Sequence, residues 1–114
     1  MNTVMIEPVM AGGGTELSAL EVHAESAASL LRAMANRHRL MILCLLSVGE
    51  SSVGELNAKL PLSQSALSQH LAVLRNDGLV LTRRLAQTIF YRLADGAAPR
   101  IIAVLRDTYC RDML

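Results

Sequence analysis

The sequence predicts a mainly α-helical domain of five helices, with one two-stranded β-hairpin before the last helix. Just over half of the 114 residues are apolar (52%), yet aromatic residues make up only 3%, which favours packed helices over a sandwich of sheets. Apolar residues recur at the helical period of 3.6 through most of the chain. After Gly78 the period changes to two, which is typical of strands. The length suits a single domain with one core.

Residues 1–15 precede the first periodic segment, and we expect them to form a flexible tail because they contain the Gly12–Gly14 run. The folded domain is then expected over residues 16–114. No run of the chain approaches the ~18 apolar residues that cross a bilayer, and Glu7 and Pro8 argue against a signal peptide. The sequence therefore predicts a cytoplasmic protein without a membrane partner. Thiols stay reduced in that compartment, so the two cysteines need not form a structural disulfide.

Two helices are predicted first. Apolar residues at helical spacing predict a helix over residues 16–35, and Asn36 then serves as the N-cap of the next helix. That second helix is expected from residue 37 to residue 48, where Gly49 stops it. Its residues 40–46 are apolar without interruption, so the helix must be covered on every side. In so small a protein, a second subunit could supply part of that cover.

Two short helices joined by a tight turn are predicted next. Ser52 and Glu55 match a capping box, and the helix that they open is ended by Pro61. Ser63 caps the following helix, which runs to the Asp77-Gly78 pair. Two helices connected in this way have the geometry of a helix-turn-helix.

The end of the domain combines a hairpin with a fifth helix. Residues 79–85 and 88–93 are β-rich runs separated by Ala86-Gln87, the length of a two-residue hairpin loop, although this pair is unfavourable for a type I′ turn. Asp95-Gly96 ends the second run, and Pro99 opens the last helix. Four helices, a hairpin wing and a last helix together predict a winged helix-turn-helix.

The second helix of the helix-turn-helix and the hairpin carry the candidate DNA-binding residues. Glutamine pairs bidentately with adenine, serine adapts to base edges or phosphates, and arginine contacts the backbone. Either element alone would more often be only a solvated polar face, but a helix-turn-helix followed by a basic hairpin favours DNA binding. We interpret His70 as packed or close to phosphate rather than as a metal ligand. The candidate contacts are Ser63, Gln64, Ser65, Ser68, Gln69, His70, Arg75, Arg83, Arg84, Gln87 and Arg92.

Several stretches carry a family resemblance, namely Ser52-Val-Gly-Glu-Leu, Leu62-Ser-Gln-Ser-Ala-Leu-Ser-Gln-His-Leu and Leu74-Arg-Asn-Asp-Gly-Leu-Val. Together with Asn36-Arg-His-Arg-Leu and Tyr91-Arg-Leu, they resemble the ArsR/SmtB family of dimeric repressors over roughly residues 27–110. The resemblance implies a homodimer formed through the first and last helices. It also implies binding to double-stranded operator DNA, with release when an inducer is sensed.

Cys44 and Cys110 are the candidate sensing residues. Metal-sensing relatives carry Cys-x-Cys or paired Asp and His ligands, and this chain has neither, so we expect no metal site and no cofactor. The two cysteines resemble the dithiol pair of the BigR/SqrR/HlyU branch of the family, which responds to sulfide and persulfide. This resemblance implies redox sensing by Cys44 and Cys110, with reactive sulfur species or oxidants as the inducer.

The two thiols are expected to react in order. Arg106 and Arg111 favour a thiolate at Cys110, while neighbouring aspartates and the helix C-terminus oppose it, which leaves the net shift open. Cys44 lies among leucines, where burial should raise its pKa. We therefore expect Cys110 to react first and Cys44 to resolve the product.

Three alternatives stay open at this point. Both cysteines could be small buried hydrophobic residues, as free cysteines commonly are. The chain could also be a metal-sensing repressor, or a winged-helix dimerisation module that senses nothing, because a fold alone does not define a function. No catalytic triad, phosphate-binding glycine loop or metal pair is present in the sequence, so we do not expect an enzyme.

Overall fold

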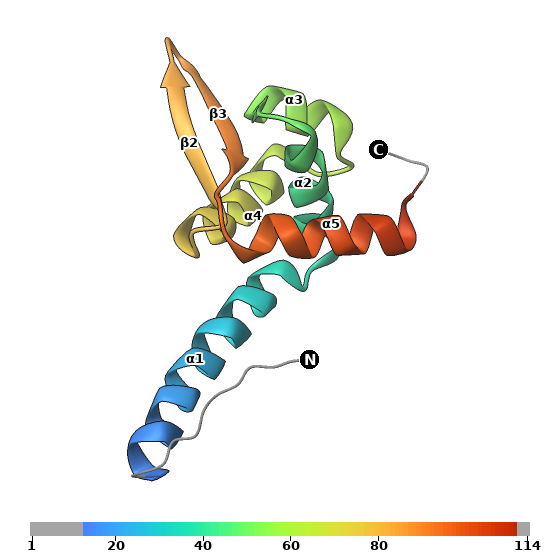
Figure 1. The fold of residues 1–114 in the computed structure, drawn as a ribbon. Coiled ribbons are helices and arrows are strands. Elements are labelled where there is room, and N and C mark those ends of the chain that lie inside the picture. Colours follow the sequence, from blue (N-terminus) through green and yellow to red (C-terminus); the bar gives the residue numbers. More distant parts are fainter. Residues whose placement is uncertain (1–12, 112–114) are drawn as a thin grey trace.

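The computed structural model describes residues 13–111 (Figure 1). These residues form five helices and three strands. In chain order the elements are α1 (Gly13–Met34), α2 (Arg37–Val48), β1 (Ser51–Ser52), α3 (Val53–Lys59), α4 (Gln64–Asn76), β2 (Val80–Leu85), β3 (Thr88–Leu93) and α5 (Ala97–Tyr109). Helix α1 thus begins at Gly13 rather than Glu16, so the last three residues of the predicted tail 1–15 are helical. The rest of that tail lies outside the described residues.

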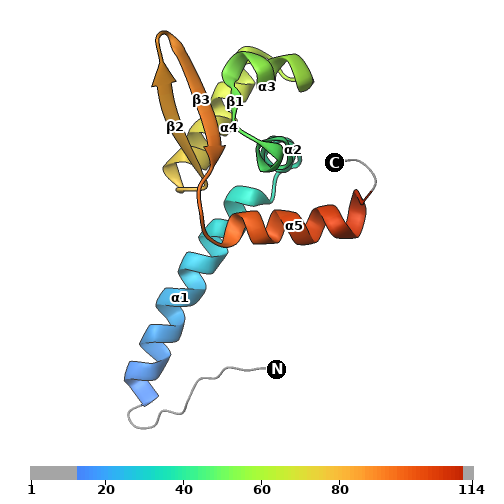
Figure 2. The ribbon, with the colours of Figure 1, turned by 45° about the horizontal axis from the view of Figure 1, so that its top comes forward.

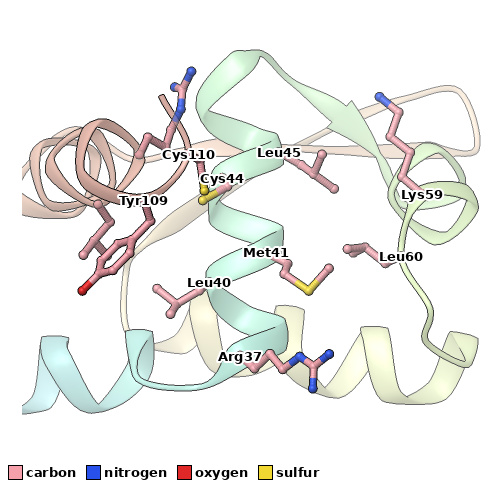
Figure 3. A pocket seen from close by; sticks show the side chains of 11 residues that line it. Arg37, Leu40, Met41, Cys44, Leu45, Lys59, Leu60, Tyr109 and Cys110 are labelled. Atoms are coloured by element: carbon pink, nitrogen blue, oxygen red, sulfur yellow. The ribbon is translucent and has the colours of Figure 1, made fainter. Parts of the chain in front are cut away.

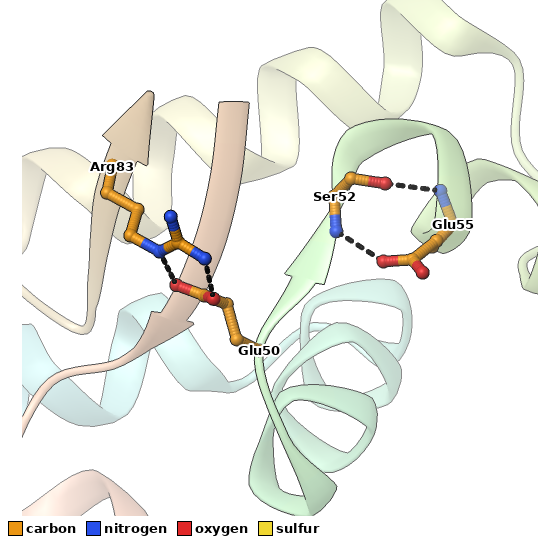
Figure 4. A network of polar contacts seen from close by, with 4 residues as sticks. All are labelled: Glu50, Ser52, Glu55 and Arg83. Carbon is orange, nitrogen blue, oxygen red and sulfur yellow. Dashed lines mark hydrogen bonds and ion pairs between the residues drawn. The ribbon is translucent and has the colours of Figure 1, made fainter. Parts of the chain in front are cut away.

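Side-chain caps set the helix boundaries, as predicted. The Asn36 side chain accepts hydrogen bonds from two backbone amides of the first turn of α2, at 3.0 and 3.1 Å. Ser52 and Glu55 form both bonds of the capping box of α3, at 2.8 and 3.1 Å (Figure 4). The Ser63 hydroxyl accepts from the third amide of α4 at 3.1 Å. Gly78 then ends α4 in the left-handed conformation, with φ 75°.

The predicted hairpin is confirmed, but it belongs to a three-stranded antiparallel sheet of order β1-β3-β2. The third strand, β1, pairs Ser51 with Tyr91 and Ser52 with Phe90. Two residues cannot show a period of two, so the sequence pattern gave no sign of this strand. The sheet corrects the predicted two-stranded wing, and the whole remains a mainly α-helical winged helix.

The start of α5 differs from the prediction, whereas the hairpin tip avoids the type I′ turn that its Ala86-Gln87 pair was expected to disfavour. Helix α5 begins at Ala97, and Pro99 lies inside its first turn, where backbone amides have no partner within the helix. At the tip, Ala86 has φ 57° and is the one non-glycine residue between 13 and 111 with a positive φ. A type I′ turn would require positive φ at Gln87 as well, so the loop adopts a different turn.

The core lies where α2, α4 and α5 meet the base of the sheet. Helix α2 contacts α1, α4, α5 and β3, which explains its long apolar run. The largest fully buried side chains are Ile42, Leu43, Leu56, Leu67, Leu71, Leu74, Val80 and Ile102. The β2–β3 hairpin projects from this body in one direction, and α1 extends in the other (Figures 1 and 2).

Helix α1 is anchored to the body only at its C-terminal end. Ala33 and Met34 are buried there, whereas Leu17, Leu20 and Val22 near the other end are exposed. The radius of gyration is 17.3 Å, compared with about 13 Å for a compact domain of 100 residues. The projecting helix accounts for this excess. Despite its length, neither α1 nor any other helix of residues 13–111 could cross a membrane.

Candidate functional site

Helix α4 presents a polar face to solvent, as the sequence predicted. Its apolar residues Leu67, Leu71 and Leu74 are buried, which turns the polar residues outward. The Ser63 hydroxyl accepts the capping bond and keeps its own proton for another acceptor, such as a phosphate oxygen. The exposed candidate residues on and before this helix are Ser63, Gln64, Ser65, Ser68, Gln69 and Arg75.

His70 is set apart from that face because it is half-buried between α4 and α2. Its ring lies 5.7 Å from the ring of His38, and its Nδ1 lies 3.4 Å from a guanidinium nitrogen of Arg39. Burial lowers the pKa of His70, and the charges of Arg39 and His38 lower it further. The packed interpretation of His70 therefore fits the structure better than a direct contact to DNA.

The hairpin carries exposed polar residues, but one of its arginines is already paired. Arg83 holds Glu50 in a bidentate ion pair with both N···O distances at 2.8 Å (Figure 4). Its guanidinium carbon also lies 4.8 Å from the centre of the Phe90 ring. The hydrogen bond from Arg83 lowers the pKa of Glu50. The other three candidates, Arg84, Gln87 and Arg92, are exposed.

Glu50 was not predicted from the sequence, because the ion pair joins residues 33 positions apart. Glu50 directly precedes β1, and Arg83 lies in β2, on the far side of β3. The pair therefore ties the hairpin to the segment between α2 and α3. No local pattern could have indicated this contact.

The structure brings Cys44 and Cys110 to one site. Cys44 belongs to α2, and Cys110 is the C-cap of α5; both thiols are free and half-buried. They line the same pocket, and their sulfur atoms are drawn next to each other in Figure 3. Burial raises the pKa of Cys44, the charge of Cys110 raises it further, and Arg106 opposes both. The prediction that burial raises the pKa of Cys44 is confirmed.

Arg106 is directed toward α2 rather than toward solvent. One of its terminal nitrogens donates to the Ser47 hydroxyl at 3.0 Å, and that hydroxyl donates to the carbonyl oxygen of Cys44 at 2.6 Å. This chain of hydrogen bonds links α5 to the α2 backbone beside the thiol. Arg111 is the other basic residue predicted to lie near Cys110, and its Nε lies 3.9 Å from Oδ1 of Asp107. Within residues 13–111, no three His, Cys, Asp or Glu side chains gather as a metal site would require.

Comparison with known proteins places this geometry in a family. Residues 36–82, which include α2 and the helix-turn-helix, match the model of the bacterial regulatory protein arsR family. The chain is 51% identical to the transcriptional activator HlyU of Vibrio cholerae over 104 residues, which cover 91% of this chain and 96% of that protein. The chain belongs to the arsR family. It is also 50% identical to a biofilm growth-associated repressor of Agrobacterium fabrum, over 86% of this chain and 84% of that protein.

Solved structures of arsR-type proteins have the same fold. The structure of reduced HlyU from Vibrio cholerae superposes with a TM-score of 0.77 at 54% identity, covering 81% of this chain and 97% of that one. A homodimeric winged helix-turn-helix DNA-binding domain from Mycobacterium bovis gives 0.72 at 31% identity, covering 87% and 89%. Regulators of the arsR family bind DNA and act as homodimers, and these relatives carry the names of regulators rather than enzymes.

Proposed function

We propose that this arsR-family chain is a homodimeric repressor that binds double-stranded operator DNA and is released by oxidation of its thiol pair. The observation that carries the DNA-binding part is the exposed polar face of α4, a helix that also contacts strand β2 of the projecting hairpin. In such a fold, α4 enters the major groove while the wing contacts the phosphate backbone. Glutamines and serines on α4 would then contact base edges, and Arg84, Gln87 and Arg92 would contact phosphates.

The outer helices supply the dimer interface in this proposal. Leu17, Leu20 and Leu31 on α1 and Val104 and Tyr109 on α5 are exposed, although all are large apolar residues. Large apolar residues exposed on two helices in this way favour a contact with another protein. A second copy would cover both helices, as the homodimeric Mycobacterium bovis domain illustrates for a related chain.

Repression follows from occupancy of DNA alone. A dimer bound at a promoter excludes other proteins from the same base pairs. Exclusion represses when the competitor is the polymerase and activates when the competitor is another repressor. One binding mode therefore accounts for relatives that carry the names of a repressor and of an activator.

The switch is proposed to be a dithiol reaction with a polysulfide, written here for hydrogen trisulfide. The Cys110 thiolate attacks the central sulfur, one S–S bond breaks, and hydrosulfide leaves, so that Cys110 carries two added sulfur atoms. The Cys44 thiolate then attacks the inner of these two atoms and expels the outer one as a second hydrosulfide. Two thiols and one hydrogen trisulfide thus give one trisulfide bridge and two molecules of hydrogen sulfide. The thiols lose two electrons, and the polysulfide gains them.

The position of the thiols supports a first attack by Cys110 and an effect of the bridge on the dimer. The raised pKa of Cys44 keeps it mostly protonated, so we assign the first attack to Cys110. A bridge would fasten the end of α5 to the middle of α2. Since α5 also belongs to the proposed dimer interface, the bridge would change the separation of the two α4 helices. Productive binding needs these helices about one DNA turn apart, ~34 Å. A solved structure of a relative, reduced HlyU from Vibrio cholerae, is distinguished by its redox state, and this supports the proposal of a redox-dependent function.

Fluorescence anisotropy at fixed salt tests the proposal, with an operator fragment selected from random duplexes by the reduced protein. We expect polysulfide to weaken operator binding by at least tenfold and dithiothreitol to restore it. Cys44→Ser and Cys110→Ser should bind like the reduced protein before and after polysulfide. Equal affinity of the wild type in both states would remove the switch and leave the DNA-binding role intact. Failure to select any operator would favour a winged-helix dimerisation module instead.

A further inference from the structure

A pocket of about 560 Å³ lies beside the thiol pair, between α2, the end of α3 and α5 (Figure 3). Pockets that bind small molecules have volumes of about 300–1,000 Å³ and mostly apolar walls with a few polar groups. The walls here fit that description, because their surface is nearly all apolar and they include Leu40, Met41, Leu45, Leu60 and Tyr109. Helix α2 is apolar nearly all round, and at this pocket other elements of the chain leave its apolar side chains partly uncovered.

The charges around the pocket are all of one sign. Arg37, Lys59 and Arg106 line it, and no aspartate or glutamate does. Arg106 is the most enclosed of the three: its Nε is buried and has no hydrogen-bond partner within residues 13–111. That buried Nε is out of reach of an occupant of the pocket, but Arg106 lines the pocket, so its positive charge attracts a negative group bound beside it. The pocket is thus complementary to a ligand with an apolar body and a negative head.

We propose that this pocket binds a small organic anion, with an aliphatic or aromatic body against α2 and α5 and its anionic head at the edge of the pocket beside Arg106. The inference deepens the proposed function, because the ligand would occupy the gap that the sulfur bridge has to close. A bound ligand separates the two thiols from incoming reagent. It also places a negative charge beside Cys44, which opposes formation of a second negative charge on that thiol. Occupancy would therefore hold the repressor in its reduced, DNA-binding state.

Anilinonaphthalene sulfonate is a suitable probe, since it has an aromatic body and one sulfonate and fluoresces when it leaves water. We expect saturable binding to the full-length reduced protein and displacement by decanoate. Arg106→Gln should weaken probe binding about tenfold, because it removes the positive charge beside the sulfonate. Met41→Trp should weaken it as well by filling the pocket. Arg100→Gln is the matched control, because Arg100 is an exposed arginine of the same helix that does not line the pocket.

A second readout follows Cys44 itself. The rate at which iodoacetamide alkylates Cys44, measured by mass spectrometry, should fall several-fold with saturating decanoate in the wild type. The same addition should leave the rate unchanged in Met41→Trp, whose fold is checked by operator binding in the reduced state. Probe binding that is absent, or that survives both Arg106→Gln and Met41→Trp, would overturn the pocket proposal. If polysulfide releases the protein from DNA but the probe does not bind, the thiol switch is supported and the pocket proposal fails. If the probe binds but polysulfide does not release the protein from DNA, the switch fails and the pocket proposal is supported.

Discussion

Neighbouring residues of strand β2 point to opposite faces of the sheet, so Arg83 and Arg84 have different surroundings. Arg83 lies opposite Phe90 and reaches across β3 to Glu50. Arg84 lies opposite Ile89, is exposed, and forms no ion pair within residues 13–111. A DNA phosphate would have to compete with the carboxylate of Glu50 for Arg83, whereas Arg84 is free to bind it. The two arginines should therefore have different roles in DNA binding.

The salt dependence of binding separates these roles. Each phosphate contact adds about 0.9 to the slope of log affinity against log salt. We expect Arg84→Gln to reduce the slope by about one contact and Arg83→Gln to leave it nearly unchanged. Anisotropy titrations over a series of salt concentrations measure both. Equal losses of slope would mean that Arg83 exchanges Glu50 for phosphate when DNA binds.

The hairpin tip contains a substitution that should stabilise the fold. Ala86 adopts a left-handed φ of 57°, which costs a residue with a Cβ about 1 kcal/mol. Ala86→Gly should relieve this strain and raise the free energy of unfolding by roughly 0.5 kcal/mol after the entropy of the unfolded glycine is subtracted. Gln87→Gly is the matched control, since Gln87 has no positive φ, and it should lower stability. Urea unfolding of the reduced dimer measures both, and a destabilising Ala86→Gly would show that the loop adopts another turn in solution.

The reactivity of Cys44 should respond to its two charged neighbours in opposite directions. Its pKa is raised by burial and by Cys110 and lowered by Arg106. Alkylation of Cys44 should accordingly reach half its maximal rate at a higher pH than for an exposed cysteine. Cys110→Ser should shift that midpoint to lower pH, and Arg106→Gln should shift it to higher pH. Quantitative mass spectrometry of the Cys44 peptide across the neutral to alkaline range provides the profile. A shift of both variants in the same direction would contradict the electrostatic account.

At the scale of elements, the sequence predicted what short-range chemistry determines. Asn36, Ser52 and Ser63 cap helices because their acceptors reach amides two or three residues away, and such spacings are visible in the chain itself. Strand β1 was missed because it exists only where β3 passes beside it. The ion pair of Arg83 and the orientation of Arg106 toward Ser47 were missed for the same reason. Both join side chains brought together by the packing of distant elements.

Helix α1 offers a direct test of the proposed dimer interface. Leu20 lies on the stripe that also contains Leu17 and Leu31, whereas Val22 lies on the opposite face of the helix. The two residues are almost equally exposed, at 61% and 63%. Leu20→Glu should dissociate the dimer at micromolar concentration by placing a charge in the interface, and Val22→Glu should not. Sedimentation velocity measures the difference, and dissociation by Val22→Glu alone would assign the interface to the other face.

The shape of the whole molecule connects this interface to DNA recognition. One chain presents a single α4, and its α1 extends away from the body with little cover (Figure 2). Pairing two chains through α1 and α5 would bury those apolar surfaces and fix two α4 helices in one rigid frame. Specificity would then depend on the frame as well as on the residues of α4, because each helix must meet its half-site simultaneously.

The spacing of the operator half-sites tests whether the dimer holds its two α4 helices at a fixed separation. We expect the operator selected by the reduced protein to be two-fold symmetric, with half-sites about one helical turn apart. Inserting about half a helical turn of base pairs between the half-sites turns one of them to the opposite side of the duplex. Affinity should then fall toward the non-specific level, a loss of roughly a thousandfold or more. The same insertion outside the half-sites should have no effect. If the inner insertion is tolerated, each α4 binds independently, and a change of the dimer frame could not release the DNA.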